Sequence, residues 1–280
     1  MRFTVLIPTF NNGDLIRCAI RSVLRQTRKN FELLVVSDGA PARTHRAVEH
    51  FAKSDSRVRL LKYKKGQRHG ELSRHDALMQ ATGEAVCYLS DDDFWFPDHL
   101  AVMERLLQKA DFAHTRHTSL IGPHHVMGFA GGLNDPETRR AMMETKTNIF
   151  GLSFAGHRMD AYKNLPEGWS PAPDDIWTDL NMWRKWLSAP GIRYGSSPLA
   201  TGLNLPAAWR KKMTLEARIA EQKMWYEIFG DPFLIEALRK SLPKTNDAIL
   251  MASVAAKANK LRRQKPPLKR ALRQLIAALR

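Results

Sequence analysis

The chain has 280 residues, of which 44% are hydrophobic and 26% charged, so it can bury a sizeable core and is not an intrinsically disordered protein. Its net charge is +16, but residues 257–280 carry nine cations and no acids, which leaves +7 for the rest of the chain. Cations that follow nucleic-acid phosphates are expected on a folded surface and not in a terminal segment, so this distribution argues against nucleic acid as a partner.

The cysteines and the amino terminus indicate an intracellular protein. Cys18 and Cys87 lie far apart and form no metal-ligand spacing, so we expect two reduced, buried thiols. The opening segment MRFTVLIPTF has too short an apolar run for a secretory signal, and no stretch approaches the ~20 apolar residues of a membrane span. We therefore expect a cytoplasmic protein, either soluble or peripheral on the inner face of the membrane.

Strands and helices alternate over the first 120 residues. Apolar runs rich in β-branched and aromatic residues predict strands at 3–10, 31–39, 57–63, 84–90 and 111–116. Helical spacing of apolar residues predicts helices at 14–27, 44–54, 71–82 and 97–110, with Asn12 or Asp14 as the cap of the first. This order predicts an α/β fold with a doubly wound, Rossmann-like, mostly parallel sheet, whose ligands bind beyond the carboxyl ends of the strands.

The alternation stops near Ile121. A stretch containing glycine and histidine follows, and further helices are predicted at 178–189 and 214–230. We expect residues 121–230 to complete the domain that residues 1–120 begin, and residues 231–280 to form a basic, helical extension.

The end of that extension reads as a short amphipathic helix over residues 266–280. Two prolines open it, and the apolar residues recur at helical spacing opposite lysines and arginines. Such a helix can lie in an anionic membrane surface. Alternatively, its apolar face packs on the catalytic domain or on a second subunit, and the cations are solvated. The sequence does not indicate the oligomeric state.

Three consecutive carboxylates, Asp91 to Asp93, follow the fourth predicted strand in the segment SDDDFWFP. Like charges this close raise one another's pKa and cost free energy unless positive charge lies among them. A bound cation is one explanation. The other is a solvated helix-capping turn before Pro97, since acidic residues are common in the first turn of a helix.

Several stretches, in the right order, resemble the family 2 glycosyltransferases, which have the A-type nucleotide-sugar-binding fold. They are VLIPTFNNGDLIRCAIRSVLRQT, FELLVVSDGA, SRHDALMQATGEAVCYLSDDDFWFPDHL and, more weakly, TDLNMWRKW. The resemblance covers residues 3–110 and, less closely, about 150–190. Two positions depart from the family pattern: Phe10 stands where tyrosine is usual, and Ser37 replaces a common aspartate.

The resemblance assigns the base of a nucleotide to the ends of the first two strands. Asp38 should accept a hydrogen bond from a ring N–H, which suits uracil or thymine. Thr9, Phe10 and Asn11 should form the wall of that pocket. The competing interpretation of Asp38 is an ordinary Asp-Gly turn after a strand.

The resemblance also assigns the ribose, the diphosphate and the metal. Asp91 should meet the ribose, and Arg74 should pair with the diphosphate, although an exposed helical arginine is the common alternative. Asp92 is the expected ligand of Mn²⁺ or Mg²⁺, and Asp93 is grouped with it in the metal site or supports the loop. These assignments depend on register and can slip by one residue. Hard divalent cations take one or two carboxylates together with phosphate oxygens, which fits this donor set.

An inverting transfer needs one general base and no enzyme nucleophile. The resemblance places that base on Asp179, at the start of a predicted helix, with Asp174 and Asp175 as nearby competitors. An aspartate stabilised by the helix dipole is the structural alternative for each of them.

Together these features lead to an expected activity. We expect a metal-dependent, inverting glycosyltransferase that moves a UDP-linked sugar to a glycan or lipid-linked acceptor in surface polysaccharide synthesis. Residues 1–120 would bind the nucleotide sugar and residues 121–230 the acceptor. The alternative is a non-catalytic, basic protein on the same fold that binds nucleotides or membrane surfaces.

Overall fold

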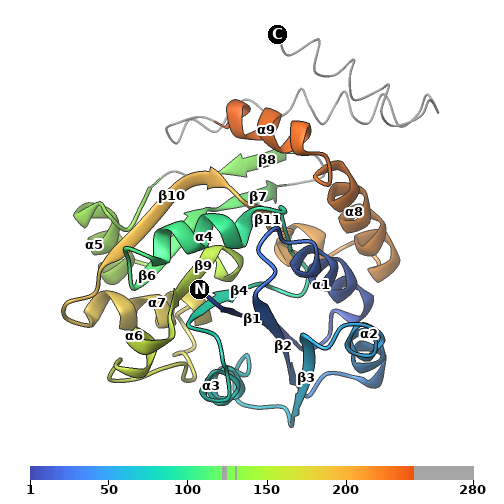
Figure 1. Cartoon of the computed structure of the whole chain (residues 1–280), viewed down its shortest axis with the longest axis horizontal. Coiled ribbons are helices and arrows are strands. Elements are labelled where there is room, and N and C mark those ends of the chain that lie inside the picture. The colour runs from blue at the N-terminus through green and yellow to red at the C-terminus, as the bar shows by residue number, and fades with distance from the viewer. Residues whose placement is uncertain (122–124, 130, 243–280) are drawn as a thin grey trace.

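The computed structural model describes residues 1–121, 125–129 and 131–242. In these residues the main sheet has seven strands in the order β10-β6-β9-β4-β1-β2-β3 (Figure 1). They are β1 (Phe3–Thr9), β2 (Phe31–Asp38), β3 (Val58–Tyr63), β4 (Ala85–Tyr88), β6 (Phe112–Arg116), β9 (Ala155–Arg158) and β10 (Tyr194–Ala200). The predicted doubly wound, mostly parallel sheet is confirmed.

Helices connect the strands, and the six helices predicted by residue range are present within a few residues of those ranges. The first half contributes α1 (Ile16–Leu24), α2 (Ala42–Ala52), α3 (Glu71–Met79) and α4 (His99–Leu107). The second half contributes α5 (Pro136–Glu144), α6 (Met159–Lys163), α7 (Thr178–Ser188), α8 (Leu215–Ile228) and α9 (Pro232–Ser241). Three short 3₁₀ turns, η1 (Gly13–Leu15), η2 (Leu152–Phe154) and η3 (Ala207–Arg210), complete the described helical elements.

The chain reverses its direction of sheet growth at β1. This strand lies between β2 and β4 and is parallel to both, so the first three strands extend the sheet one way and β4 begins the other. At such a switch point the loops after the two central strands diverge and leave a crevice. The residues after β1 and β4 therefore meet at one edge of the sheet.

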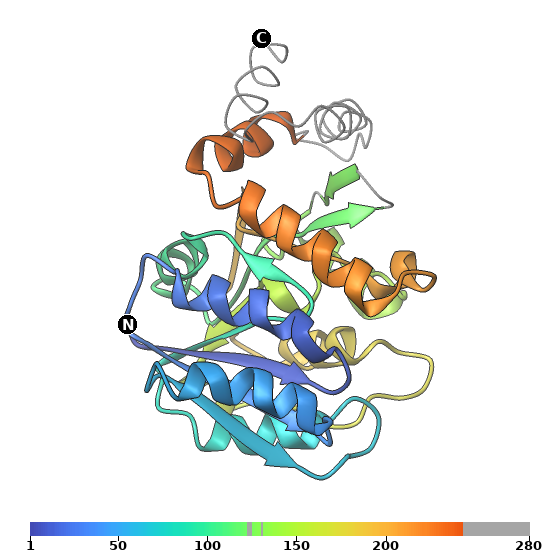
Figure 2. The same cartoon turned by 90° about the vertical axis from the view of Figure 1, so that its right-hand side faces the viewer.

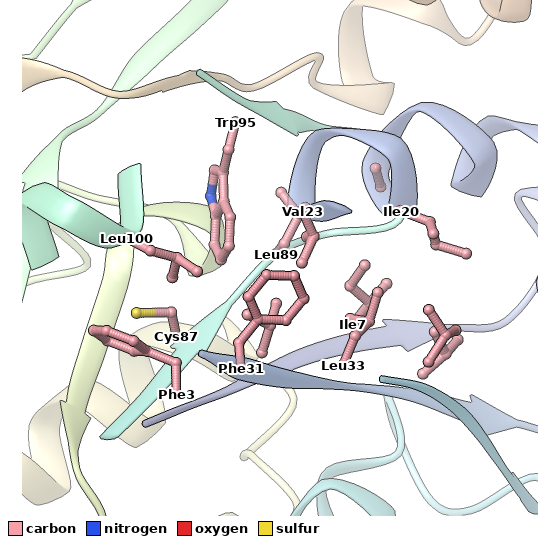
Figure 3. Close-up of a cluster of buried hydrophobic side chains, with 14 of the residues drawn as sticks. Phe3, Ile7, Ile20, Val23, Phe31, Leu33, Cys87, Leu89, Trp95 and Leu100 are labelled. Atoms are coloured by element: carbon pink, nitrogen blue, oxygen red, sulfur yellow. The ribbon is translucent and has the colours of Figure 1, made fainter. Parts of the chain in front are cut away.

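Each face of the sheet has its own hydrophobic core. Figure 3 shows the cluster in which Phe3, Ile7 and Leu33 of the sheet pack against Ile20 and Val23 of α1. On the other face, side chains of α3, α6 and α7 pack in a cluster that includes the fully buried Trp183 and Trp186. Burial on both faces explains why β1 and β2 read as continuous apolar runs rather than alternating ones.

A third core joins the carboxyl-terminal part to the acidic segment. It contains aromatic and aliphatic side chains of α8 and α9, including Trp225 and Phe229, and it also contains Phe94 and Phe96. Trp95, which lies between these two phenylalanines, packs instead into the cluster of Figure 3. The residues alternate because Phe94–Trp95 is a strand, β5, paired with β11 (Gly202–Leu203). The aromatic run after the carboxylates thus fastens their loop to two cores.

The strands that follow β6 were not predicted. Strand β9 enters the sheet antiparallel between β4 and β6, and β10 adds an edge beside β6. A small hairpin of β7 (Thr118–Ile121) and β8 (His125–Gly128) lies near α9 (Figure 2). Residues on both sides of position 120 therefore build one sheet. That residues 1–120 bind the nucleotide sugar and residues 121–230 the acceptor stays a prediction.

The prediction that Asn12 or Asp14 caps the first helix is wrong. Asn12 precedes η1 without a capping hydrogen bond, and its amide donates instead to Asp91 at 2.7 Å. Asp14 pairs with Arg17 at 2.6 Å. Both cysteines are free and buried, as expected.

The described part of the chain contains no helix that is both long and apolar enough to cross a bilayer. The amphipathic helix predicted at residues 266–280 lies outside the described residues.

Candidate active site

A pocket of about 310 Å³ opens at the carboxyl ends of β1, β2 and β4. Its wall includes seven of the eight predicted ligand and metal residues and adjoining side chains of the loop before α3. The predicted ones are Thr9, Phe10, Asn11, Asp38, Arg74 and Asp91, together with Asp92 of the predicted metal pair. The structure thus brings together residues that are up to 83 positions apart in the sequence, from position 9 to position 92.

Asp38 lies on the inner wall of this pocket and is 4% exposed. Its Oδ1 accepts from the amide of Gly66 at 2.7 Å, and its Oδ2 accepts from Lys65 Nζ at 2.6 Å. This is more than a free Asp-Gly turn, because the carboxylate is fixed by the loop that follows β3. Each oxygen of an ionised carboxylate has two acceptor positions, so Asp38 keeps the capacity to accept a further N–H from a ligand in the pocket.

Phe10 forms the outer wall beside Asp38. Its ring is 49% exposed, and the ammonium of Lys65 lies 5.4 Å from the ring centroid. An exposed aromatic face next to a buried carboxylate suits a flat, hydrogen-bonding ring, with stacking on one side and polar recognition at the edge. Nothing in the sequence pointed to a role for Lys65.

Asp91 is held by the amino-terminal part of the chain. Thr9 Oγ1 donates to its Oδ2 at 2.6 Å, and Asn12 Nδ2 donates to its Oδ1 at 2.7 Å. Burial raises the pKa of this carboxyl, and these two hydrogen bonds oppose the rise. The bonds fix the end of β1 to the end of β4 across the switch point.

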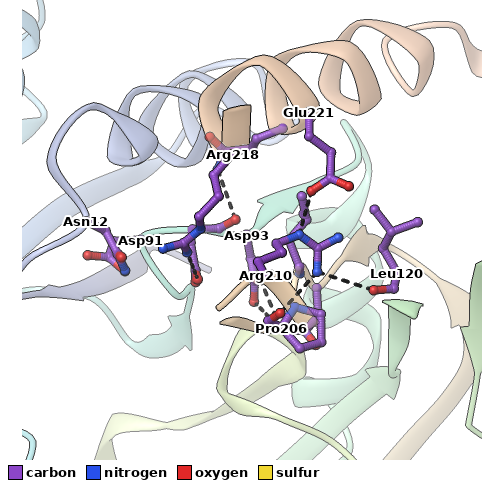
Figure 4. Close-up of polar contacts among 12 residues, drawn as sticks. Asn12, Asp91, Asp93, Leu120, Pro206, Arg210, Arg218 and Glu221 are labelled. Carbon is purple, nitrogen blue, oxygen red and sulfur yellow. Dashed lines mark hydrogen bonds and ion pairs between the residues drawn. The ribbon is translucent and has the colours of Figure 1, made fainter. Parts of the chain in front are cut away.

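Asp92 projects into the pocket and is partnered by a cation from the carboxyl-terminal part. Arg218 Nη2 lies 3.1 Å from its Oδ2 (Figure 4 shows Arg218 reaching from α8 toward this loop). Gln222, one helical turn further on, donates to the Asp92 carbonyl at 2.9 Å. Burial, followed by the charges of Asp93 and Asp91, raises the pKa of Asp92 well above its usual value, and Arg218 opposes the rise.

Asp93 supports the loop and does not line the pocket. Its carboxylate accepts from Ser153 Oγ, from Asn204 Nδ2 at 3.0 Å and from the amide of Leu205 at 2.8 Å. Burial raises its pKa to about 6. With both oxygens occupied by protein donors, Asp93 fits the supporting role better than that of a metal ligand, and we retain Asp92 as the candidate ligand.

Arg74 is buried rather than exposed, which rules out the common alternative for a helical arginine. It is 7% exposed, its guanidinium lies over the ring of Trp169 at 4.9 Å, and Nη2 donates to the His69 carbonyl at 2.9 Å. Burial lowers its pKa, and within the described residues its Nε has no hydrogen-bond partner. A buried donor left in this state is available to an anionic ligand.

A second pocket of about 510 Å³ adjoins the first one. Both are lined by Arg68, His69, Arg74 and Leu152, so they form one continuous cleft. Asp179 lines the second pocket, near the start of α7, and burial raises its pKa. The exposed ring of Trp177 lies beside it.

The competitors of Asp179 are placed differently. Asp175 is exposed and does not line this pocket. Asp174 lines the rim, where it pairs with Arg68 at 2.5 Å. Of the three carboxylates, Asp179 is the one that interacts with Arg74. The charge of Arg74 lowers the pKa of Asp179, and burial raises it.

The first pocket offers a divalent cation few protein ligands of its own. The described residues contain no group of three or more His, Cys, Asp or Glu side chains suited to hold a metal ion. Asp92 offers one pocket-facing carboxylate, and phosphate oxygens complete the coordination of Mg²⁺ in many such sites. The donor set is therefore compatible with Mg²⁺ or Mn²⁺ bound together with a diphosphate.

Comparison with known proteins gives a family. The model of the family described as "Glycosyl transferase family 2" matches residues 4–155, more than half of the chain. The chain is 35% identical over 108 residues to the UDP-Glc:alpha-D-GlcNAc-diphosphoundecaprenol beta-1,3-glucosyltransferase WfgD of Escherichia coli. It is 33% identical over 125 residues to the GalNAc(5)-diNAcBac-PP-undecaprenol beta-1,3-glucosyltransferase of Campylobacter jejuni. These regions cover 38% and 43% of this chain, and they span only 41% and 38% of those relatives.

Solved structures share the fold. TarS 1–349 of S. aureus has a TM-score of 0.57 at 18% identity, covering 84% of this chain and 71% of that one. The mannosyltransferase PcManGT from Pyrobaculum calidifontis, solved in complex with GDP-Man and Mn²⁺, has a TM-score of 0.52 at 19% identity, covering 99% of this chain and 80% of that one. The A-type fold expected from the sequence is thereby confirmed.

Gly70, at the start of α3, leaves room for Asp38, and its replacement tests how tightly that carboxylate is held. Its φ is +76°, and a Cβ there would lie 2.5 Å from Asp38 Cγ. Gly191 is a matched control, since its φ is +74° and nothing lies within 4 Å of its Cβ position. We expect Gly191→Ala to cost about 1–2 kcal/mol for the left-handed backbone, and Gly70→Ala about 1–3 kcal/mol more for the clash. Urea unfolding of both variants measures the difference, and equal losses would contradict the rigid placement of Asp38.

Proposed function

The chain belongs to glycosyl transferase family 2, and from that premise we propose that it transfers a sugar from a nucleotide-sugar donor, with inversion, to a lipid-linked or glycan acceptor. One observation carries the proposal: a single cleft holds Asp38 and Asp92 in its first pocket and Asp179 in its second, with Arg74 lining both. A nucleotide, a diphosphate and an acceptor hydroxyl therefore have chemically suitable partners in adjoining pockets.

The donor is proposed to be UDP-linked. Asp38 would accept the ring N–H of uracil, Phe10 and Asn11 would enclose the base, and Asp91 would meet the ribose. The WfgD relative is named for a UDP-Glc donor, and TarS was solved in complex with UDP-GlcNAc. Arg74, with its unpartnered Nε, would donate to the diphosphate.

Negative charge develops on the leaving diphosphate, and it must be stabilised in the cleft. Asp92 would hold Mg²⁺ or Mn²⁺, which supplies Lewis-acid stabilisation of that charge when bound. PcManGT, which shares the fold, was solved with Mn²⁺ and a nucleotide sugar. Arg74 and Lys65 add fixed positive charge along the same wall.

The acceptor hydroxyl has to lose a proton as its oxygen attacks the anomeric carbon. Asp179 would take that proton from the second pocket, while burial gives it a pKa closer to neutrality than that of an ordinary aspartate. The charge of Arg74 lowers the pKa of Asp179 against the effect of burial and so favours the ionised form. The two curated relatives described above carry names with diphosphoundecaprenol or PP-undecaprenol acceptors, which supports a lipid-linked acceptor here.

Hydrolysis of a panel of sugar nucleotides, with and without Mn²⁺, tests the activity and the donor. We expect metal-dependent hydrolysis of a UDP-sugar, and a loss of roughly 10²-fold or more in Asp92→Asn because the metal loses its protein carboxylate. Asp111→Asn is the control, since Asp111 pairs with Arg193 away from the cleft. Unchanged turnover in Asp92→Asn would remove Asp92 from the metal site. Failure to hydrolyse any donor would favour the non-catalytic alternative.

Replacement of the proposed base separates chemistry from donor binding. Asp179→Asn should bind UDP normally but lose turnover by roughly 10²-fold or more, the scale of general base catalysis. Asp175→Asn is the matched control, because the same change falls on an exposed carboxylate outside the pocket. Steady-state kinetics with saturating donor measures both. If Asp175→Asn is the inactive variant, the base is misassigned.

A lipid-linked acceptor would bring the protein to the inner face of the membrane, and residues 266–280 are proposed to bind that surface. A chain shortened to end at Gln264 should keep donor hydrolysis but no longer sediment with anionic liposomes at low salt. The reason is that each cation near such a surface contributes ~1 kcal/mol. Aggregation of the shortened chain, or indifference of the full chain to liposomes, would assign the segment a structural role.

A further inference from the structure

Among the described residues, the middle carboxylate of the segment 91–93 differs from its two neighbours in the kind of partner that it has. Asp91 accepts from the neutral side chains of Thr9 and Asn12, and Asp93 accepts from neutral donors of the second half. Among the described residues, Arg218 is the one cation paired with any of the three, and it pairs with Asp92. Arg218 therefore places its positive charge beside Asp92, where the proposed function places the charge of a divalent cation.

Arg218 is not fully bonded in this position. Its side chain is 17% exposed, and Nη2 makes the single ion pair with Asp92 at 3.1 Å. Within the described residues its Nε is buried without a hydrogen-bond partner. A guanidinium carries five donors, and a buried donor without an acceptor costs free energy, so this arrangement leaves binding capacity unused beside the pocket.

The helix that carries Arg218 is firmly seated. Gln222 donates to the Asp92 carbonyl, and Glu221 pairs with the buried Arg210 at 2.5 Å (Figure 4). Trp225 and Tyr226, in the last turns of α8, lie in the third core. The backbone is thus anchored along the helix, and a change of partner by Arg218 requires only rotation of its own side chain.

We propose that Arg218 is an exchangeable counter-ion: it neutralises Asp92 in the free protein, leaves this carboxylate when a divalent cation binds, and then donates to the donor diphosphate. The inference rests on the proposed function. A planar guanidinium bonds phosphate oxygens as well as it bonds a carboxylate, so the exchange conserves its hydrogen bonding. It also keeps the buried carboxylate paired at each stage, since either Arg218 or the metal lies beside it.

Binding measurements without turnover test this exchange. The probes are Mn²⁺ alone, followed by the electron paramagnetic resonance signal of the free ion, and UDP in the presence of saturating Mn²⁺, followed by calorimetry. The variants are Arg218→Gln and Arg218→Lys. Lys223→Gln is the control, because it removes the same charge from the same helix at an exposed position.

Arg218→Gln should bind Mn²⁺ alone about 3-fold or more tighter than the unmodified protein, because the competitor for Asp92 is gone, and it should bind UDP about 10-fold more weakly, the scale of one charged hydrogen bond. Lys223→Gln should change neither affinity by more than about 2-fold, as expected of a solvated surface charge. Arg218→Lys, which keeps the charge but not the fork, should leave the Mn²⁺ affinity near that of the unmodified protein and still weaken UDP. If Arg218→Gln does not fold, as judged by circular dichroism, the Arg218→Lys result decides.

Unchanged UDP affinity in Arg218→Lys and unchanged Mn²⁺ affinity in Arg218→Gln would overturn the exchange. So would weaker Mn²⁺ binding in Arg218→Gln, which would make Arg218 a structural support of the site. Asp92→Asn separates the two levels of the argument. If it binds Mn²⁺ as well as the unmodified protein does, the proposed metal site fails and the exchange with it. If it loses Mn²⁺ while Arg218→Gln behaves like Lys223→Gln, only the exchange fails.

Discussion

The partnering of three adjacent carboxylates at the end of β4 governs the rest of this structure. Three buried like charges are tolerable only if each has its own donors. Asp91 takes them from the first loop, Asp93 from Ser153 and the segment around Asn204, and Asp92 from α8. One loop thereby ties together the amino-terminal, central and carboxyl-terminal parts of the described chain.

The aromatic residues that follow the carboxylates explain why such a loop holds its shape. Phe94 and Phe96 pack in the third core, and Trp95 packs in the cluster of Figure 3. Because side chains alternate between the two faces of a strand, this short segment anchors the loop on both sides. Apolar burial of this kind supplies the free energy that clustering like charges costs. The position of Asp92 at the pocket wall is therefore set by packing and is not left to the loop itself.

Arg74 connects the two pockets, because it lines both of them. It packs over Trp169, lines both parts of the cleft and lowers the pKa of Asp179. In the proposed function this cation would serve both the diphosphate and the general base, since it would attract the leaving group and lower the pKa of the base. This shared residue is why donor and acceptor chemistry can be discussed as one site.

The sequence by itself determined the sheet of the first half, because hydrophobic runs and helical periodicity there are local signals that no distant residue overrides. It also indicated Asp38, Asp91 and Asp92, because they follow strands whose carboxyl ends meet at one edge. It did not indicate β9, because the place of this short strand in the sheet depends on β4 and β6. Nor did it indicate four polar side chains of the site, which look like ordinary surface residues in the sequence: Lys65, Ser153, Asn204 and Arg218. The choice between Asp179 and Asp175 was likewise beyond it, since both are aspartates within one turn of a helix start. The tertiary structure puts Asp179 in the pocket wall and Asp175 outside it, and the assignment of the base stays a proposal. It also placed the other residues, because a hydrogen bond between residues 126 positions apart, such as Arg218 to Asp92, leaves no periodic trace in either segment.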